Sequence, residues 1–370
     1  MIAKAPLFIM VGGFLGAGKT TTVGRLAKHY QAQGKRVIVV TNDQAADLVD
    51  THTLRAQGLE VGEVAGSCFC CNFDELTGVM EKLAGTGLPD VVLAEPVGSC
   101  TDLVATVMRP LEKVYRKPMR LAPYAVILKP GHGRRILGNQ AKAGFSPQAA
   151  YIFRKQLEEA DLVLVNRADE LKPEEVAELT RLVNEQFPGR PVLPISAGTG
   201  AGFDQFIQTL EQGTMVPGQR TMEVDYDIYA QGEADLGWLN SQGAVRADKP
   251  FDLDLLALGL VRTIQDLLNE REAETAHLKV TVKGAGAIAV ANSIDNTTAP
   301  RLSQPAQRQS SEAELILNAR VALDPETLAR LVEQGTAEAA RALGGLASLE
   351  NLRSFRPGRP VPTHRFQQPD

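Results

Sequence analysis

A glycine-rich run near the start of the chain has the residue types and spacing that bind phosphate. The segment from Gly13 to Thr20 reads GFLGAGKT and matches the pattern G-x-x-x-x-G-K-[ST]. It follows an apolar stretch that predicts a strand and opens a stretch that predicts a helix, which is the context that the pattern requires. Glycines let backbone N–H groups converge on phosphate oxygens, while Lys19 reaches the β- and γ-phosphates and the Thr20 hydroxyl ligates Mg²⁺. The expected nucleotide contacts in this region are Gly13, Gly16, Ala17, Gly18, Lys19, Thr20 and Thr21.

Two acidic residues end neighbouring predicted strands. Asp43 follows the apolar run that starts at residue 37, and Glu95 opens the segment Glu-Pro-Val-Gly. Ligands of an open α/β sheet lie at the carboxyl ends of its strands, so either carboxylate can complete the Mg²⁺ shell or orient the attacking water. A glycine at position 98 allows its backbone N–H to approach the γ-phosphate closely and to move after hydrolysis. We therefore expect a catalytic set of Lys19, Thr20, Asp43 and Glu95, with Mg²⁺ on Thr20 and Glu95.

Two later loops predict which base is bound. One predicted strand ends in Asn166-Arg167-Ala168-Asp169, and the next ends in Ser196-Ala197-Gly198. They have the order and position of the guanine-reading loops of GTPases. A carboxylate at Asp169 accepts hydrogen bonds from guanine N1–H and its exocyclic amine, whereas adenine would leave that acceptor unpaired. The sequence therefore predicts guanine binding through Gly98, Asn166, Arg167, Asp169, Ser196 and Ala197.

Three of the four cysteines lie within four residues, in the segment Gly-Ser-Cys-Phe-Cys-Cys-Asn. Cys68, Cys70 and Cys71 suit a thiophilic ion such as Zn²⁺, because thiolates neutralise its charge and tetrahedral geometry tolerates ligands from one tight loop. Cys100 lies five residues after Glu95 and is a further candidate ligand, although a single cysteine is more often a small buried apolar residue. The cysteine usage also favours thiol or metal chemistry in a reducing compartment over disulfides.

Alternating apolar runs and amphipathic stretches position these residues. Continuous apolar runs predict strands buried on both faces, as in a parallel sheet. Amphipathic stretches predict helices from Thr20 towards Gln33 and from Pro173 to Phe187. The first half is thus expected to be an α/β layered domain. The predicted strands are Leu7 to Val11, Val37 to Thr41, Val91 to Ala94, Tyr124 to Leu128, Leu162 to Val165 and Val192 to Ile195.

The pattern changes in the second half of the chain. Turn residues without periodicity predict a linker at 213–222, which separates a first domain at 1–212 from a second at 223–370. We expect the second domain to be a smaller α+β domain. The stretch from Thr297 to Ser311 is rich in Pro, Gln and Ser and predicts a mobile hairpin loop. The expected elements are a strand near Trp238, helices from Asp254 to Glu272 and from Asp324, and strands at His277 to Lys283, Ala287 to Ser293 and Glu314 to Val321.

Composition narrows the class of partner. The chain has 370 residues, of which 44% are hydrophobic and 22% charged, with a formal net charge of -5. The composition is typical of a folded protein. The negative net charge argues against stable binding to nucleic acid or to an anionic membrane, because both need a basic surface. The first apolar run is too short for a membrane span and no small-residue cleavage site follows it. We expect a cytoplasmic protein with no nucleic-acid or membrane partner.

Taken in order, these motifs resemble those of the CobW-type GTPases, relatives of the UreG and HypB nickel-insertion GTPases. The resemblance covers Gly12 to about Gly202 and rests on the P-loop, Cys-x-Cys-Cys, Glu-Pro-Val-Gly, Asn-Arg-Ala-Asp and the Ser-Ala loop. It implies a P-loop NTPase domain with a mostly parallel sheet, followed by a smaller α+β domain. It further implies GTP hydrolysis and nucleotide-dependent transfer of Zn²⁺ or Co²⁺ to a client protein or cofactor pathway. A homodimer is compatible with it.

Departures from the family pattern limit that reading. Arg167 stands where these GTPases carry lysine, and its stem can cover the base in the same way. Ser67 separates Gly66 from the first cysteine, and the histidine-rich tract of many members is absent, so metal storage is not expected. Two alternatives stay open. One is a P-loop kinase or ATP-dependent ligase acting on a metabolite, and the other is a thiol redox sensor on a GTPase scaffold.

Overall fold

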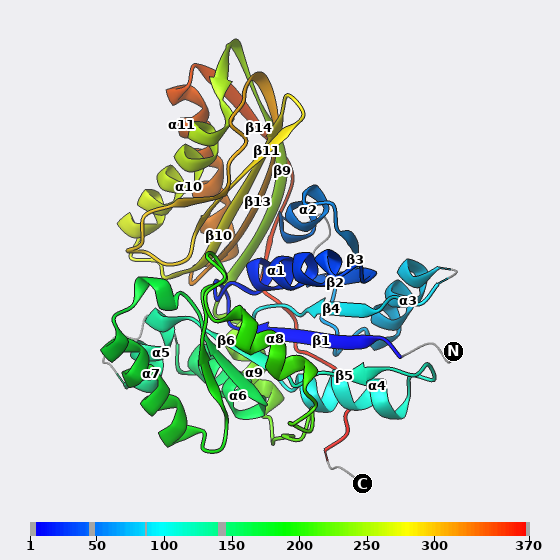
Figure 1. Ribbon diagram of the computed structural model, residues 1–370. Coiled ribbons are helices and arrows are strands. Elements are labelled where there is room, and N and C mark those ends of the chain that lie inside the picture. Colours follow the sequence, from blue (N-terminus) through cyan, green and yellow to red (C-terminus); the bar gives the residue numbers. More distant parts are fainter. Residues whose placement is uncertain (1–4, 44–48, 86, 140–145, 368–370) are drawn as a thin grey trace. The chain divides into compact units, whose positions relative to one another are not determined.

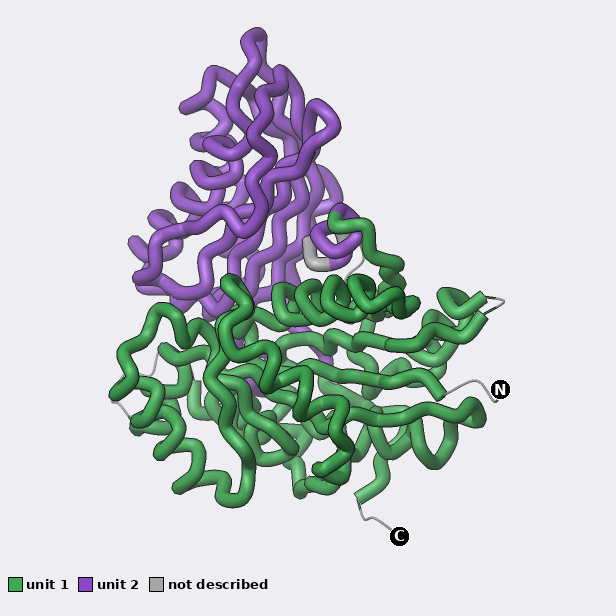
Figure 2. The backbone as a smooth tube through the Cα atoms, in the orientation of Figure 1, with its two compact units in different colours: residues 1–46, 57–230, 359–370 green, residues 47–56, 231–358 purple. Residues whose placement is uncertain are grey.

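The computed structural model describes residues 5–43, 49–85, 87–139 and 146–367. The chain divides into two compact units, which Figure 2 shows in different colours. The first unit contains residues 1–46, 57–230 and 359–370, and the second contains residues 47–56 and 231–358. Each unit is described by itself.

The first unit is built on a parallel sheet (Figure 1) with the strand order β3-β2-β4-β1-β6-β7-β8, in which the short β5 also pairs with β1. Every residue of β1, β4, β6 and β7 is buried, as expected for strands covered on both faces. The predicted α/β class is confirmed. The strands are β1 (Leu7–Gly13), β2 (Val37–Asp43), β3 (Glu60–Ala65), β4 (Val91–Glu95), β5 (Arg120–Leu121), β6 (Ala125–Leu128), β7 (Leu162–Val165) and β8 (Val192–Pro194).

Several helices of the first unit begin where the sequence supplies a cap or a proline. The Ser146 hydroxyl accepts a hydrogen bond from the Ala149 amide at the start of α6, and Glu175 accepts one from the Lys172 amide before α7. These helices are α1 (Lys19–Ala32), α3 (Phe73–Ala84), α4 (Arg109–Lys113), α5 (Pro130–Leu137), α6 (Pro147–Glu159), α7 (Pro173–Gln186), α8 (Phe203–Glu211) and α9 (Tyr226–Ala234), with a π-turn at Val104–Met108 and a 3-10 turn at Ala168–Glu170.

The second unit is an antiparallel sheet with the order β12-β11-β10-β13-β9-β14, against which α10 and α11 pack to form an apolar core. Asp252 and Asp324 cap the two helices by accepting backbone N–H groups of their first turns. The predicted α+β character is confirmed. The elements are α2 (Val49–Ala56), β9 (Gly237–Asp252), α10 (Leu253–Glu270), β10 (Thr275–Gly284), β11 (Ala287–Ser293), β12 (Arg301–Gln304), β13 (Gln309–Val321), α11 (Pro325–Ala342) and β14 (Gly345–Phe355).

Two sequence expectations differ from the structure. The boundary between the two units lies near Ala230, not in the predicted linker at 213–222. Residues 213–230 stay with the first unit because the Gly218 amide donates to the buried Asp161 carboxylate at 2.7 Å and because Tyr229 is fully buried. The last residues of the chain also belong to the first unit. The stretch from Thr297 to Ser311 is not a plain loop, since it contains β12 and the start of β13, which pair with β11 and β9.

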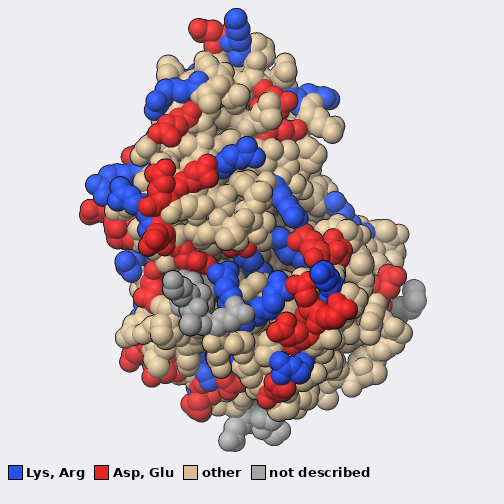
Figure 3. All heavy atoms as spheres, turned by 90° about the vertical axis from the view of Figure 1, so that its left-hand side faces the viewer, with Lys and Arg blue, Asp and Glu red and all other residues tan. Residues whose placement is uncertain are grey.

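No helix in the described part of the chain is long and apolar enough to cross a membrane. Basic and acidic side chains are interspersed over the face that Figure 3 shows.

Candidate functional site

The P-loop lies between the end of β1 and the start of α1. Gly18 precedes the helix with a φ of 102°, a conformation that favours glycine, and no described side chain caps the N-terminus of α1. The buried Lys19 ammonium donates to the Gly13 carbonyl at 3.0 Å. Backbone N–H groups at a helix start beside a lysine ammonium are suited to binding an anion such as a phosphate group.

Thr20 and Glu95, two residues of the predicted Mg²⁺ site, are in contact at the carboxyl end of the sheet. The Thr20 hydroxyl donates to Glu95 Oε1 at 2.8 Å, and Glu95 is buried at the end of β4, the strand beside β1. A hydroxyl and a carboxylate are hard oxygen donors, which Mg²⁺ prefers. The pair therefore fits the ion that the P-loop motif implies.

Gly98 packs directly against the P-loop. A Cβ at this position would lie 2.8 Å from Leu15 Cδ2 and 2.9 Å from Lys19 Nζ. A side chain here would displace the lysine or the loop. Gly98 thus packs against Lys19, the residue expected to contact phosphate, and its predicted approach to the γ-phosphate stays a prediction.

Asn166 has a structural role that the motif alone did not indicate. Its amide Nδ2 donates to the Ala17 carbonyl of the P-loop at 2.7 Å, and its Oδ1 accepts the amides of Arg167 and Ala197 at 2.8 and 2.9 Å. Gly18 leaves room for this amide, because a Cβ there would lie 2.4 Å from Nδ2. Asn166 thus joins the phosphate loop to both predicted base-reading loops.

The predicted base-reading carboxylate is accessible. Asp169 is exposed in the 3-10 turn that follows Arg167, whose backbone is left-handed with a φ of 61°. One strand later, the buried Ser196 hydroxyl accepts the Thr199 amide at 3.1 Å and shapes the neighbouring turn. Exposure of Asp169 beside an ordered loop leaves its oxygens open to a base.

Sequence reasoning missed Arg25. Its guanidinium donates to the Ala197 carbonyl at 2.9 Å and to the Gly198 carbonyl at 2.5 Å, and it lies over the Phe203 ring. The arginine therefore ties the Ser-Ala loop to α1. An amphipathic helix pattern gives no signal for such a contact. The prediction for the Asp43 side chain lies outside the described side chains, although its backbone ends β2.

The cysteine loop follows β3 and brings three thiols together. The Cys68 sulfur lies 2.7 Å from that of Cys70 and 3.2 Å from that of Cys71, and the sulfurs of Cys70 and Cys71 are 3.7 Å apart. The turn closes through the Cys71 and Asn72 amides, which donate to the Cys68 carbonyl. Tetrahedral ligands with Zn–S bonds of about 2.3 Å lie about 3.8 Å apart, so the three sulfurs can share one ion after Cys68 moves away from Cys70 and Cys71 by about 1 Å or less. The donor set fits a thiophilic metal.

Neighbouring thiols set the protonation of this cluster. A hydrogen bond with Cys100, then bonds with Cys68 and Cys71, raise the pKa of Cys70 well above its usual value. The bond with Cys68 raises the pKa of Cys71 to about 11. Cys70 and Cys71 therefore keep their protons at neutral pH when no metal is bound, so an ion that binds these two thiols must displace protons. Cys100, the further candidate ligand, therefore lies in contact with Cys70.

Asn42 positions the cysteine loop and was not singled out from sequence. Its amide Nδ2 donates to the Val64 and Ser67 carbonyls at 3.0 and 2.7 Å, and its Oδ1 accepts the Phe69 amide at 2.8 Å. This residue near the end of β2 fixes the loop that follows β3, the adjacent strand.

One short segment links the two sites. In the segment from Glu95 to Cys100, Glu95 accepts a hydrogen bond from the Thr20 hydroxyl and Gly98 packs against Lys19. At its other end, Cys100 is hydrogen-bonded with the Cys70 thiol. The buried Gln156 amide stabilises its far end by donating to the carbonyls of Gly98 and Cys100 at 3.0 and 2.8 Å. The segment touches both groups of candidate residues.

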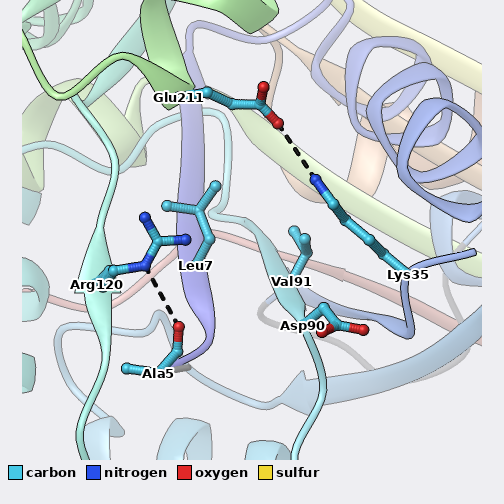
Figure 4. Close-up of a pocket in the computed structure, with 7 residues that line it drawn as sticks. All are labelled: Ala5, Leu7, Lys35, Asp90, Val91, Arg120 and Glu211. Carbon is cyan, nitrogen blue, oxygen red and sulfur yellow. Dashed lines mark hydrogen bonds and ion pairs between the residues drawn. The ribbon is translucent and has the colours of Figure 1, made fainter. Parts of the chain in front are cut away.

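A pocket of about 320 Å³ lies elsewhere, at the amino ends of β1 and β4 (Figure 4). Its charged residues are partnered, since Lys35 pairs with Glu211 at 3.4 Å and Asp90 accepts the Arg36 amide at 2.8 Å. The carboxyl ends of the same strands carry the P-loop and Glu95, so this pocket is separate from the candidate site.

Comparisons with known proteins agree with the motifs. The family model "CobW/HypB/UreG, nucleotide-binding domain" matches residues 7–194. The zinc chaperone YeiR of Escherichia coli (strain K12) is 30% identical over 178 residues, 46% of this chain and 49% of that protein. The zinc chaperone CobW of Pseudomonas aeruginosa is 28% identical over 216 residues, 50% of this chain and 55% of that protein. The Zn(II)-bound YjiA GTPase from E. coli matches with a TM-score of 0.39 and 15% identity, over 92% of this chain and 99% of that chain.

The aligned part of the chain spans about half the length of YeiR and of CobW. The family model, however, covers just over half of the chain and includes the P-loop, the cysteine loop, the Glu-Pro-Val-Gly segment and the Asn-Arg-Ala-Asp loop. The chain therefore belongs to the CobW/HypB/UreG family.

Proposed function

We propose that this protein binds and hydrolyses GTP and uses the nucleotide state to control the binding and transfer of a thiophilic metal ion to a client protein. The observation that carries the proposal is the segment from Glu95 to Cys100. It contacts Thr20 at one end and Cys70 at the other, so a shift that accompanies hydrolysis changes the surroundings of the thiols. Zn²⁺ is the favoured cargo, since the relatives YeiR and CobW are zinc chaperones; Co²⁺ satisfies the same donors.

The hydrolysis step is assigned to the P-loop and its neighbours. The Lys19 ammonium and the amides at the start of α1 stabilise the charge that develops on the transferring phosphoryl group. Mg²⁺, when bound, neutralises charge on the β- and γ-phosphates. Thr20 and Glu95 hold that ion, and Gly98 admits the γ-phosphate beside Lys19.

Guanine selection is tested at Asp169. We expect GTP to bind more tightly than ATP. Asp169→Asn should weaken GTP binding about 10- to 100-fold, because a hydrogen bond to a charged group contributes about 1.5–3 kcal/mol. The measurement is competition of GTP and ATP for a fluorescent nucleotide. Asp204→Asn, an exposed carboxylate in the first turn of α8, makes the same charge change and should bind GTP normally. Equal affinities for GTP and ATP would favour the metabolite kinase or ligase.

Metal binding is tested by stoichiometry. Protein purified without oxygen should bind one Zn²⁺ per chain, and Cys70→Ser should lose most of that binding while its nucleotide affinity is unchanged. Cys70 is the thiol in contact with the three others. Absence of zinc in reduced protein, together with a reversible change in GTP turnover on oxidation, would instead identify the redox sensor.

A further inference from the structure

The end of the chain crosses the cysteine loop. We call residues 359–367, which follow β14 and belong to the first unit, the C-terminal strap (Figure 2). The Val361 amide donates to Cys71 Sγ at 3.2 Å. The Thr363 amide donates to the Cys70 carbonyl at 2.8 Å, and the Thr363 hydroxyl donates to the Cys71 carbonyl at 3.0 Å. Two of the three clustered cysteines are thus bonded to the strap.

An ion pair between Arg365, four residues after Val361, and the buried Asp102 holds the strap in place. Arg365 Nε donates to Asp102 Oδ2 at 2.6 Å, and its Nη2 donates to the Met222 carbonyl at 2.9 Å. Asp102 is 1% exposed and its backbone is left-handed with a φ of 65°. Tyr226 donates to the same Oδ2 at 2.7 Å, while Oδ1 has no hydrogen-bond partner in the described structure. Arg365 is therefore the cation that compensates this buried carboxylate.

Asp102 also belongs to the segment that joins the two sites. It lies two residues after Cys100, and the Glu159 carboxylate fixes its neighbourhood by accepting the Thr101 hydroxyl at 3.1 Å and the Val104 amide at 3.0 Å. The anchor of the strap and the loop that contacts the P-loop are therefore one continuous piece of chain.

On the metal function proposed above, we infer that Arg365 is a positioning residue of the metal site, which holds the strap closed so that the Val361 amide stays on the Cys71 sulfur. An N–H donated to a thiolate stabilises its negative charge and fixes its orientation, and such outer partners change metal affinity about 10- to 100-fold. Cys71 is the most accessible of the three thiols, so the strap also covers the route by which an ion or a client thiol reaches the cluster.

The first test needs no metal. In the full chain, the rate at which iodoacetamide alkylates Cys71 is measured by mass spectrometry for the unchanged protein and for Arg365→Ala. We expect about a tenfold faster rate in Arg365→Ala, because uncovering the Cys71 sulfur outweighs the smaller thiolate fraction that follows loss of the Val361 N–H. We expect partial recovery in Arg365→Lys and no change in Arg359→Ala. Arg359 lies on the same strap, and its ion pair with Asp227 is largely exposed. Equal Cys71 rates in Arg365→Ala and the unchanged protein would overturn the inference.

Arg365→Ala leaves a buried carboxylate unpaired and could unfold the unit. The double variant Asp102→Asn with Arg365→Gln removes both charges together, and it should also alkylate faster while keeping normal nucleotide affinity. A rate equal to that of the unchanged protein would again overturn the inference.

The second test uses zinc. Arg365→Ala should bind the same number of zinc ions at saturation, because every thiol is intact, but should release them about tenfold faster to excess chelator. The spectrum of the Co²⁺-loaded chain should change in the thiolate charge-transfer region, with partial return in Arg365→Lys. Unchanged release and an unchanged spectrum would overturn the role of Arg365. Failure of the unchanged protein to bind zinc would overturn the proposed metal function alone, since the alkylation rate of Cys71 still measures whether Arg365 holds the strap closed.

Discussion

Gly98 leaves no room for a side chain in the segment that runs from the candidate Mg²⁺ residue Glu95 to Cys100. It lies against Leu15 and Lys19 on one side, and its carbonyl accepts the buried Gln156 amide on the other. A backbone with no side chain is needed there because the lysine ammonium already occupies the space that a Cβ would take.

Gly98→Ala should therefore weaken the binding of a non-hydrolysable GTP analogue more than the binding of GDP. The added methyl group would lie 2.9 Å from Lys19 Nζ and 3.1 Å from Leu15 Cα, so it competes with the lysine and with the γ-phosphate. We expect a loss of about tenfold or more for the triphosphate, measured as the ratio of the two dissociation constants. Gly78→Ala, in α3 where a Cβ meets nothing within 4 Å, is the matched control and should leave the ratio unchanged. A proportional loss for both nucleotides would contradict this role.

The sequence predicted the residues of the site better than their supporting contacts. Lys19, Thr20 and Glu95 follow from a motif and from strand ends, and the structure brings them together. The contacts of Asn42 and Arg25 depend on which strands and loops become neighbours, so no local pattern reveals them. The strap was missed because it is far from the cysteines in sequence and its residues form no motif.

At the scale of elements, the π-turn Val104–Met108 depends on one buried acid. Glu159, at the end of α6, accepts the Val104 amide at 3.0 Å at the start of this turn. Burial raises the pKa of Glu159 well above its usual value, and the nearby Asp102 raises it further. The folded chain therefore holds a proton on this carboxyl that the unfolded chain releases.

This raised pKa fixes the sign of a pH effect. Between the ordinary pKa of 4.5 and the raised value, the folded state binds more protons than the unfolded state, so the free energy of unfolding falls as pH rises through that window. Glu159→Gln keeps an acceptor for Val104 and cannot ionise. Its thermal midpoint should exceed that of the unchanged protein by more at pH 8 than at pH 5.

The matched control is Glu158→Gln, which removes a neighbouring carboxylate that is 40% exposed and pairs with Lys155. It should shift the midpoint equally at both pH values. If Glu159→Gln behaves like this control, then Glu159 does not govern the pH response of the first unit.

Element prediction from sequence succeeded where apolar runs were continuous. The run at Leu162–Val165 is a strand with the predicted bounds, and those at β1, β2 and β4 differ by a few residues. β3 was missed because its sequence, EVGEVA, carries two glutamates and a glycine and is only partly buried. β12 and β14 were missed for a related reason: they form the two edges of the second sheet and expose alternate polar residues.

At the scale of the whole molecule, the nucleotide and metal sites share the first unit, and a single segment touches both. Ligands that favour the same position of the segment from Glu95 to Asp102 must help each other to bind. The strap adds a third contact to this segment through Asp102. On the proposed function, coupling between GTP and zinc is therefore expected through this segment.

Linkage gives this coupling a measurable form. If the GTP analogue tightens zinc binding by some factor, zinc must tighten the binding of the analogue by the same factor. We expect a coupling of about 1–3 kcal/mol, a change in zinc affinity of roughly 5- to 150-fold between the GTP-analogue and GDP states. Chelator competition measures the zinc affinity in each state, and nucleotide titrations with and without zinc measure the reciprocal factor.

Cys70→Ser provides the control for that experiment, since it should lose the effect of zinc on nucleotide affinity while still binding GTP. A zinc affinity that is the same in both nucleotide states would instead describe a structural ion, which closed thiolate sites commonly hold. The same measurement in Arg365→Ala separates the two routes by which the segment reaches the thiols. Coupling that passes through the contact of Cys100 with Cys70 should survive the loss of Arg365. Coupling that passes through Asp102 and the strap should be lost, because a movement of Asp102 then no longer moves the Val361 amide on the Cys71 sulfur.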